Sequence, residues 1–387
     1  MMETDQPALL RSAVIGMGFV GPHHVDAIRR SGFADVAVIA GSDSRRTANG
    51  ARRLGVAKWS TDALAVIGDP DVDVVHICTP NDTHVALATA ALQAGKHVVV
   101  EKPIALDRAS ADLLMELAER SGRHAMVALT YRGYPMVQRA RSLVAAGEVG
   151  EIRLIHGGYI QDWLSDPADY NWRLEPEISG RSRAVADIGT HWFDTAEFIT
   201  GLRADAVMAD FATLIPRRMR PLEGATAFST SAGPAEPISI HTEDVATILF
   251  RFAGGARGAC TISQVSTGRK NHFTLDVDGS EQSLAWDQET PERLWARSRR
   301  EARLLVRDPG SEQPASGVPS LPAGHPEGWG EALRDLIRPF YAAVANGDPP
   351  TPEDAPYPSL RVGARSLAFV DAAIESASTA AWVSLKP

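Results

Sequence analysis

Residues 187–194, DIGTHWFD, carry two carboxylates and an imidazole in one short stretch. On a helix, which turns by about 100° per residue, Asp187, His191 and Asp194 lie within about 60° of one another. A carboxylate one turn before a histidine suits acid–base chemistry, because imidazole takes up and returns a proton near neutral pH. The wet face of an amphipathic helix has the same pattern, so this motif alone leaves both interpretations open.

A glycine-rich stretch near the start of the chain, VIGMGFVG (14–21), has the spacing G-x-G-x-x-G. It follows an apolar run and opens a helical pattern, which is the context that a dinucleotide-binding loop requires. Gly16 allows a tight turn, Gly18 lets a pyrophosphate approach the backbone, and Gly21 lets the helix pack on the strand. The loop predicts cofactor contacts from Gly16, Met17, Gly18, Phe19, Val20 and Gly21.

The choice between NAD and NADP is read at the end of the second strand, in AGSDSRR (40–46). An acid there binds the ribose 2′-hydroxyl, and Asp43 fits that role. A small polar residue with a nearby arginine accepts a 2′-phosphate instead, and Ser42 with Arg45 fits that one. Both cofactors remain open.

Two further motifs, CTPNDTH (78–84) and VVVEKP (98–103), follow apolar runs. Strand ends in a doubly wound sheet are where ligands bind, so these motifs are predicted to line the cofactor crevice. A lysine after a strand is also typical of a solvated loop, and His84 of a satisfied loop histidine. The candidate crevice residues are Thr79, Pro80, Asn81, His84, Glu101 and Lys102.

The elements that must position these groups follow an alternating pattern in the first third of the chain. Continuous apolar runs alternate with helical patterns at 84–94 and 108–121, which indicates a parallel sheet covered on both faces. The predicted strands are 12–16, 35–40, 73–78, 97–100 and 124–131.

Longer, partly alternating runs follow residue 130 and predict a second, mostly antiparallel sheet. They lie at 151–160, 244–252, 256–265 and 271–279. A Pro-, Gly- and Ser-rich loop is expected at 308–328, then helices near 329–346 and 359–378. These patterns predict an α/β fold class: a doubly wound parallel sheet in an N-terminal domain (8–130), then an α+β domain with a mostly antiparallel sheet (131–387).

Composition limits the function classes. The 387 residues are 44% hydrophobic with a formal net charge of −9, which disfavours a nucleic-acid partner. Two distant cysteines, Cys78 and Cys260, offer neither a disulfide framework nor zinc-site spacing, so no metal is predicted. No stretch has the length of a membrane span, and the first residues lack the apolar core of a signal peptide. A cytoplasmic protein without a membrane partner is expected.

GMGFVG, CTPNDTH, EKP and DIGTHWFD occur in an order and spacing that resemble the glucose–fructose oxidoreductase / inositol dehydrogenase / rhizopine catabolism (Gfo/Idh/MocA) family. YRGYP (131–135), NWRLEPEISG (171–180) and residues 359–385 extend the resemblance over nearly the whole chain. The resemblance implies hydride transfer between a nicotinamide cofactor and a hydroxyl-bearing carbon, usually of a sugar or cyclitol. It also implies an N-terminal Rossmann domain, a C-terminal domain with a large open sheet, and a homodimer or homotetramer.

By motif position, the resemblance implies that Lys102 and His191 are the catalytic pair, with Asp187 beside the histidine. This agrees with the chemistry of alcohol oxidation. A histidine base takes the hydroxyl proton, Lys102 stabilises the developing alkoxide, and Asp187 orients the ring or binds a substrate hydroxyl.

The chain departs from the family just before this helix, where members often carry a glycine tract. Here SGRSRAVADIG (179–189) contains Arg181 and Arg183. They are expected either to form a loop salt bridge or to contact an anionic group of the substrate or cofactor.

The substrate pocket is predicted from polar and aromatic residues near the presumed site, such as YIQDWL (159–164). A neutral pyranoside or a cyclitol is the leading substrate class. The alternatives are a reductase of a non-sugar carbonyl or imine, and a nucleotide-binding sensor without catalysis. The candidates are Tyr131, Arg132, Gln161, Asp162, Trp163, Asn171, Arg173, Trp192 and His325.

Overall fold

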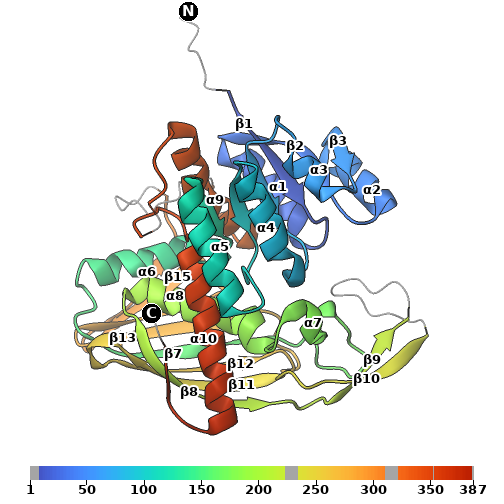
Figure 1. Ribbon diagram of the computed structural model, residues 1–387. Helices are drawn as coiled ribbons and strands as arrows, with labels where there is room; N and C mark the ends of the chain where they lie inside the picture. Colours follow the sequence, from blue (N-terminus) through green and yellow to red (C-terminus); the bar gives the residue numbers. More distant parts are fainter. Residues whose placement is uncertain (1–7, 223–233, 310–320, 352, 386–387) are drawn as a thin grey trace, which may run out of the picture.

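The structure is a computed structural model that describes residues 8–222, 234–309, 321–351 and 353–385. The N-terminal part is built around a parallel sheet, and a second, wider sheet forms the opposite side of the molecule (Figure 1). Among the described residues, no helix is long and apolar enough to cross a membrane.

The first sheet has six strands in the order β3-β2-β1-β4-β5-β6, and each pair of neighbours is parallel. Its central strand β4 is buried along its whole length, because helices cover both faces. The predicted Rossmann fold is confirmed. The strands are β1 (Leu10–Ile15), β2 (Ala34–Ala40), β3 (Lys58–Ser60), β4 (Val74–Ile77), β5 (His97–Val100) and β6 (Ala125–Val127), and the helices are α1 (Val20–Ser31), α2 (Ser44–Leu54), α3 (Ala63–Ile67), α4 (His84–Gln93) and α5 (Arg108–Ser121).

Two helices from the end of the chain complete the cover of this sheet. Phe340 and Tyr341 of α9 (Trp329–Asn346) join the buried cluster on the α1 side, and Leu360 and Leu367 of α10 (Leu360–Thr379) join the cluster on the other side. In Figure 1, α10 runs beside α5 and continues to the second sheet at β8. Both helices start and end within about one residue of the predicted ranges.

The second sheet has nine strands in the order β16-β15-β14-β13-β7-β12-β11-β8-β17. All neighbours are antiparallel except β7 and β12, so the predicted, mostly antiparallel sheet is confirmed. Buried and exposed residues alternate along its strands, as expected when one face packs on helices α6 (Pro135–Ala145) and α8 (Thr190–Thr200). The strands are β7 (Ile152–Ile160), β8 (Ala204–Ala212), β11 (Val245–Phe252), β12 (Arg257–Ser263), β13 (His272–Gly279), β14 (Gln282–Asp287), β15 (Arg293–Ser298), β16 (Ala302–Val306) and β17 (Val383–Ser384).

Some local expectations are corrected. The run 124–131 is a strand only over Ala125–Val127, and its end forms a 3₁₀ turn at Thr130–Gly133. The strands after β7 that the sequence did not predict include the pair β9 (Arg217–Pro221) and β10 (Ala235–Ser239). Residues 310–320 of the predicted loop lie outside the described residues.

Candidate active site

Lys102 and Asp187 meet where the two parts of the molecule join. Lys102 lies just after β5, and Asp187 lies in a π-helical turn, Val185–Gly189, that leads into α8. The Lys102 ammonium donates to Asp187 Oδ1 and to the Asp187 carbonyl oxygen, each at 2.7 Å. Both side chains are largely buried, which strengthens a charge-assisted bond.

The Asp187 carboxylate is an acceptor for three side chains. Besides Lys102, Arg173 Nε donates to Oδ1 at 3.1 Å and Gln264 Nε2 donates to Oδ2 at 2.8 Å. Burial alone raises the pKa of Asp187, but the charges of Lys102 and Arg173 outweigh it and hold that pKa well below its usual range. Asp187 therefore stays ionised.

His191 lies one helical turn after Asp187. Its ring packs against Tyr131 and Tyr159, with centroids at 4.9 and 6.3 Å. His191 Nδ1 is buried and has no hydrogen-bond partner among the described residues. Burial and the charge of Lys102 lower the pKa of His191 well below its usual value, although Asp187 opposes this. The result is a neutral imidazole that can accept a proton.

A hydrogen-bonded network of aromatic and amide side chains extends from His191. Tyr131 and Tyr159 share a hydrogen bond of 2.6 Å between their hydroxyls, and Tyr159 donates to Asn271 Oδ1 at 2.6 Å. Gln161 donates to the same Asn271 oxygen at 2.8 Å and accepts from Trp163 Nε1 at 2.9 Å. The predicted residues Tyr131, Gln161 and Trp163 are thus in one network.

Two more predicted residues flank Asp187. Asn171 Oδ1 accepts from the backbone N–H of Arg173 at 3.1 Å, and Arg173 itself contacts Asp187. Asn171 Nδ2 and Gln264 Oε1 are buried with no partner among the described residues, as is His191 Nδ1. Buried polar atoms without partners indicate a place where a polar ligand binds.

Four predicted substrate residues have other roles. Arg132 forms a two-point ion pair with Asp194 at 2.6 and 2.8 Å, so Asp194 is not part of an acid–base stripe. Trp192 is fully buried in the core, where its ring stacks on that of Phe250. It therefore does not line the pocket.

Asp162 accepts from Lys270 at 2.7 Å and from the Gly268 N–H at 3.0 Å, so it fastens that loop. His325 is exposed, and its backbone carbonyl accepts from Arg307 at 2.6 Å. These contacts direct both residues to neighbours outside the Lys102–Asp187–His191 group.

The phosphate loop has the space that a dinucleotide needs. A Cβ on Gly16, whose φ is +102°, would lie 2.4 Å from the Cys78 carbonyl oxygen, and one on Gly21 would lie 2.1 Å from that of Gly16. A Cβ on Gly18 would meet nothing within 4 Å. Gly16 and Gly21 therefore serve the turn and the close packing, and Gly18 keeps the approach to the backbone open.

The remaining cofactor candidates are placed as follows. Met17 and Val20 are half-buried, and Phe19 is exposed and packs on Trp329. Asp43 caps α2 by accepting from the Arg46 N–H at 2.6 Å, and Ser42 and Arg45 are exposed beside it. Thr79 accepts from the Thr83 hydroxyl at 2.6 Å, Pro80 precedes a 3₁₀ turn, and Asn81 donates to the Ser179 carbonyl at 3.4 Å.

His84 is a correction. It is fully buried, and its ring nitrogens lie 2.7 Å from the Pro103 carbonyl oxygen and 2.9 Å from that of Thr79. It joins the two crevice loops to each other instead of facing a ligand. Glu101 is buried as well and pairs with His24 of α1 at 2.9 Å.

The two unexpected arginines form ion pairs. Arg181 pairs with Asp371 at 2.7 Å on the surface. Arg183 is fully buried and contacts Asp244, which also binds the buried Arg218 at 3.2 Å. The salt-bridge interpretation is therefore correct for both.

The sequence missed Tyr159, Gln264 and Asn271. These residues reach the site because β7 lies between β12 and β13, with Tyr159 opposite Ile262 and Phe273. Gln264 follows the end of β12, and Asn271 precedes the start of β13. Neither position is part of a motif, so the sequence did not indicate that these amides are functional.

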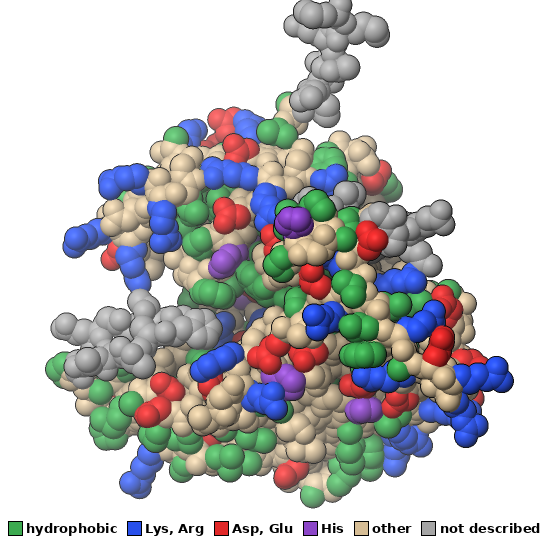
Figure 2. Space-filling view, turned by 180° about the vertical axis from the view of Figure 1, so that it is seen from behind, with side chains coloured by type: hydrophobic (Ala, Val, Ile, Leu, Met, Phe, Trp, Pro, Cys, Tyr) green, Lys and Arg blue, Asp and Glu red, His purple; other side chains and the backbone are tan. Residues whose placement is uncertain are grey.

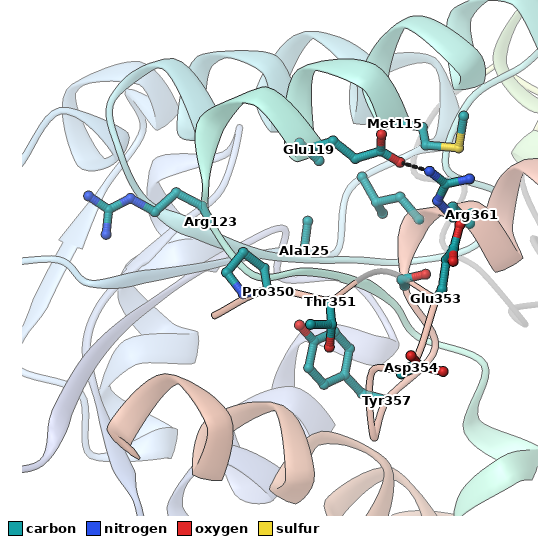
Figure 3. Close-up of a pocket in the computed structure, with 13 residues that line it drawn as sticks. Met115, Glu119, Arg123, Ala125, Pro350, Thr351, Glu353, Asp354, Tyr357 and Arg361 are labelled. Atoms are coloured by element: carbon teal, nitrogen blue, oxygen red, sulfur yellow. Dashed lines mark ion pairs between the residues drawn. The ribbon is translucent and has the colours of Figure 1, made fainter. Parts of the chain in front are cut away.

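Two other features lie outside the Lys102–Asp187–His191 group. A pocket of about 410 Å³ lies between α5 and the segment that leads into α10, and Figure 3 shows Glu119 and Arg361 paired across it. None of its lining residues belongs to the Lys102–Asp187–His191 group. His272, Asp287 and Glu289 have donor atoms within 4.8 Å of one another, an arrangement that ion pairing also explains.

Comparison with known proteins finds family matches for both parts of the chain. Residues 10–129 match a family model described as an oxidoreductase family with an NAD-binding Rossmann fold. Residues 137–285 match one described as the GFO/IDH/MocA C-terminal domain.

Relatives match over nearly their full length. Levoglucosan dehydrogenase of Pseudarthrobacter phenanthrenivorans is 33% identical, over 89% of this chain and 88% of that protein. Myo-inositol 2-dehydrogenase of Thermotoga maritima is 24% identical, over 88% of this chain and 90% of that protein. The structure of levoglucosan dehydrogenase in complex with NADH and levoglucosan is 30% identical, with a TM-score of 0.87, and covers 98% of this chain and 100% of that one. That of an inositol dehydrogenase homolog with NAD⁺ from Azotobacter vinelandii is 28% identical, with a TM-score of 0.83, and covers 99% of this chain and 100% of that one.

Proposed function

The chain belongs to the GFO/IDH/MocA oxidoreductase family, and from that premise we propose that Lys102, Asp187 and His191 oxidise a secondary hydroxyl of a neutral sugar or cyclitol. It is a dehydrogenase that transfers a hydride between a nicotinamide cofactor and a CH–OH group. The observation that carries the residue assignment is the buried Lys102–Asp187 pair beside a neutral histidine whose Nδ1 has no partner among the described residues.

Lys102 holds the reacting oxygen. An ammonium group has three N–H donors, and two of those of Lys102 go to Asp187. The third is available for the substrate oxygen, whose negative charge grows as the proton leaves. Asp187 fixes the direction of this donor, with Arg173 and Gln264 holding the carboxylate in turn.

His191 accepts the hydroxyl proton. The substrate O–H bond breaks as the N–H bond of the imidazolium forms, and the oxygen becomes the carbonyl of the product. When bound, the nicotinamide ring supplies the acceptor for the hydride of the same carbon. The two electrons of the C–H bond thus leave with the hydride, and the proton remains on His191 until it passes to solvent.

The phosphate loop fits a dinucleotide, since Gly18 leaves open space at the first residues before α1. We assign NAD rather than NADP because Asp43 already accepts from the α2 N-terminus with one oxygen and has the other for a ribose 2′-hydroxyl. A 2′-phosphate in that position would be repelled by the carboxylate.

The pocket beside Asp187 suits a neutral polyhydroxy compound. Asn171 Nδ2 and Gln264 Oε1 offer one donor and one acceptor that the described residues leave unused. The hydroxyl and amide network from Tyr131 to Gln161 supplies further partners of both kinds. A sugar or cyclitol presents hydroxyls that donate and accept at once, so it can satisfy both sets.

The arrangement of the chain supports two further assignments. We assign residues 8–130 to cofactor binding and 131–387 to substrate binding and assembly, because one face of the second sheet carries no helix among the described residues (Figure 1). Such a face suits a homodimer or homotetramer. Light scattering of the purified protein tests this, and a monomer at all concentrations would contradict it.

A substrate screen tests the function. The purified protein is mixed with NAD⁺ or NADP⁺ and with levoglucosan, myo-inositol, scyllo-inositol or D-apiose, and the absorbance of reduced nicotinamide is followed. We expect turnover with at least one polyol and a preference for NAD⁺.

Two outcomes would contradict the proposal. Cofactor binding without turnover on any polyol would favour the sensor interpretation. Turnover confined to non-sugar ketones or imines would favour a carbonyl or imine reductase.

The cofactor assignment has a test of its own. An Asp43→Ala variant that keeps its preference for NAD⁺ would contradict it.

A further inference from the structure

A row of buried hydrogen bonds leads from Glu101 along the face of the parallel sheet that α1 and α9 cover. His24 Nε2 lies 2.9 Å from Glu101 Oε1, and His24 Nδ1 lies 2.8 Å from His76 Nδ1. His76 Nε2 lies 2.7 Å from the Tyr341 hydroxyl, which lies 2.7 Å from Ser12 Oγ. The five side chains come from β1, α1, β4, α9 and the turn after β5.

An ionised Glu101 only accepts, so His24 carries a proton on Nε2. When His24 is neutral it accepts through Nδ1, and this sets the direction of the other bonds. His76 then donates through Nδ1 and accepts through Nε2 from the Tyr341 hydroxyl. The Tyr341 oxygen in turn accepts from Ser12.

The ends of the His24–His76 pair differ in charge. Burial lowers the pKa of His76 well below its usual value, so that ring is neutral. Burial raises the pKa of Glu101, but the hydrogen bond from His24 and nearby positive charges, among them Lys102, outweigh it and leave that pKa below its ordinary value. Glu101 is therefore the charged acceptor at one end of the row.

The row has no outlet to water. Ser12, His24, His76 and Tyr341 are all fully buried, and Glu101 is 9% exposed. A relay that delivers protons to solvent needs an exposed end, and the Ser12 end has none. The row instead ties Glu101, and with it the next residue Lys102, to a helix that lies more than 200 residues later in the chain.

We propose that His24, His76 and Tyr341 are positioning residues, which hold Glu101 in a single orientation and so fix the turn that carries Lys102. Tyr341 completes the row, because its hydroxyl supplies the donor for His76 Nε2. Without it His76 Nε2 is a buried acceptor that lacks this donor, so the single arrangement of the row loses part of its stabilisation. The consequence for turnover rests on the proposed function, whereas the tautomers do not depend on it.

The test compares two buried tyrosines of the same kind. Tyr341→Phe removes the hydroxyl from the row. Tyr357→Phe is the matched control, because the Tyr357 hydroxyl also lies against a histidine, at 2.6 Å from His124 Nδ1, but outside the row. Nitrogen NMR of ¹⁵N-histidine-labelled protein reports the tautomer of each ring, with assignment from His24→Gln and His76→Gln.

In the wild type we expect His24 with its proton on Nε2 and His76 with its proton on Nδ1. In Tyr341→Phe we expect the His76 signals to lose this single tautomer, and kcat to fall by about fivefold, the effect of one hydrogen bond, with KM for the cofactor little changed. In Tyr357→Phe only the His124 signals should move, with kcat near that of the wild type.

The proposal is overturned if the wild type holds His24 as an imidazolium or with its proton on Nδ1. It is also overturned if the two variants lower kcat equally. The wild-type spectrum needs no variant and no substrate, so it decides the proposal even if Tyr341→Phe fails to fold or no polyol is oxidised.

Discussion

At the scale of single residues, the carboxylate of Asp187 is the acceptor around which the site is arranged. Lys102, Arg173 and Gln264 all donate to it, and His191 lies one turn away. The sequence pointed to Lys102, Asp187, His191 and Arg173, since each lies in a motif. It could not show that Asp187 binds Lys102 rather than the His191 ring.

Asp187→Asn should therefore impair turnover without unfolding the protein. Asparagine keeps the shape, but its NH₂ group must face one of three donors, so the Lys102 ammonium loses its fixed direction. We expect kcat to fall on the order of 10²-fold, as when an oxyanion donor is lost. Steady-state kinetics with the best polyol of the screen measure this.

Asp194→Asn is the matched control on the same helix. It weakens the buried pair with Arg132, so we expect a loss of stability of about 3 kcal/mol and little loss of kcat. If Asp194→Asn lowers kcat as much as Asp187→Asn does, the two carboxylates have been assigned the wrong roles.

The pH dependence of turnover follows from His191. A base must be unprotonated to act, and burial and Lys102 lower the pKa of His191. The acid limb of kcat/KM should therefore lie below about pH 6.5, the ordinary value for histidine. A limb at or above that pH in the wild type would contradict a buried, neutral His191.

At the scale of elements, the ends of parallel strands are enough to place much of the site from the sequence alone. Lys102 follows β5 and the glycines follow β1, as the alternating pattern predicted. The register of the second sheet could not be predicted from the sequence, because pairing of β7 with strands about 100 residues later depends on tertiary contacts. For that reason Tyr159, Gln264 and Asn271 were missed.

Substitutions of two glycines in the phosphate loop should have different effects, one on cofactor binding and the other on stability. A Cβ at Gly18 meets no protein atom but occupies the approach to the phosphates, so Gly18→Ala should weaken NADH binding by about tenfold or more, with little change in Tm. Gly16→Ala, at φ +102° and against the Cys78 carbonyl, should cost about 1–3 kcal/mol of stability from backbone strain alone.

NADH fluorescence titration and thermal unfolding measure the two effects. The reverse pattern, with Gly18→Ala unstable and Gly16→Ala of normal stability, would contradict the geometry of this loop.

The segment before α8 offers a matched pair of arginines. Arg183→Met leaves the buried Asp244 with Arg218 alone, and removing one partner of a buried pair costs about 3–5 kcal/mol. Arg181→Met breaks an exposed pair with Asp371 and should cost at most about 1 kcal/mol. Urea unfolding checks both, and equal losses would contradict the burial of Arg183.

At the scale of the whole molecule, the two ends of the chain depend on each other. Helices α9 and α10 cover opposite faces of the N-terminal sheet, so the Rossmann fold is completed by residues after 328. The sequence predicted both helices, but the face against which each packs is a tertiary property.

Acidic and basic side chains are interspersed over the face of the molecule that Figure 2 shows.

Buried neutral histidines make global stability depend on pH. Burial lowers the pKa of His76 and lowers that of His97 to about 4, whereas in the unfolded chain both titrate near 6.5. Between these values the unfolded state binds more protons, so stability is full above about pH 6.5 and falls as the pH decreases below it.

Urea unfolding at several pH values measures the slope. His97→Asn, which keeps an acceptor for the His124 N–H, should reduce the slope. An unchanged slope in His97→Asn would contradict the burial of that ring.

The central claim is that Lys102 and His191 together carry the proton chemistry of a cofactor-binding dehydrogenase. Its most direct test is turnover of Lys102→Ala and His191→Ala with the polyol and cofactor that the wild type prefers, beside NADH titration of the same preparations. The account predicts that each variant loses at least about 10²-fold in kcat while both still bind NADH. Near-normal turnover by both variants would contradict it.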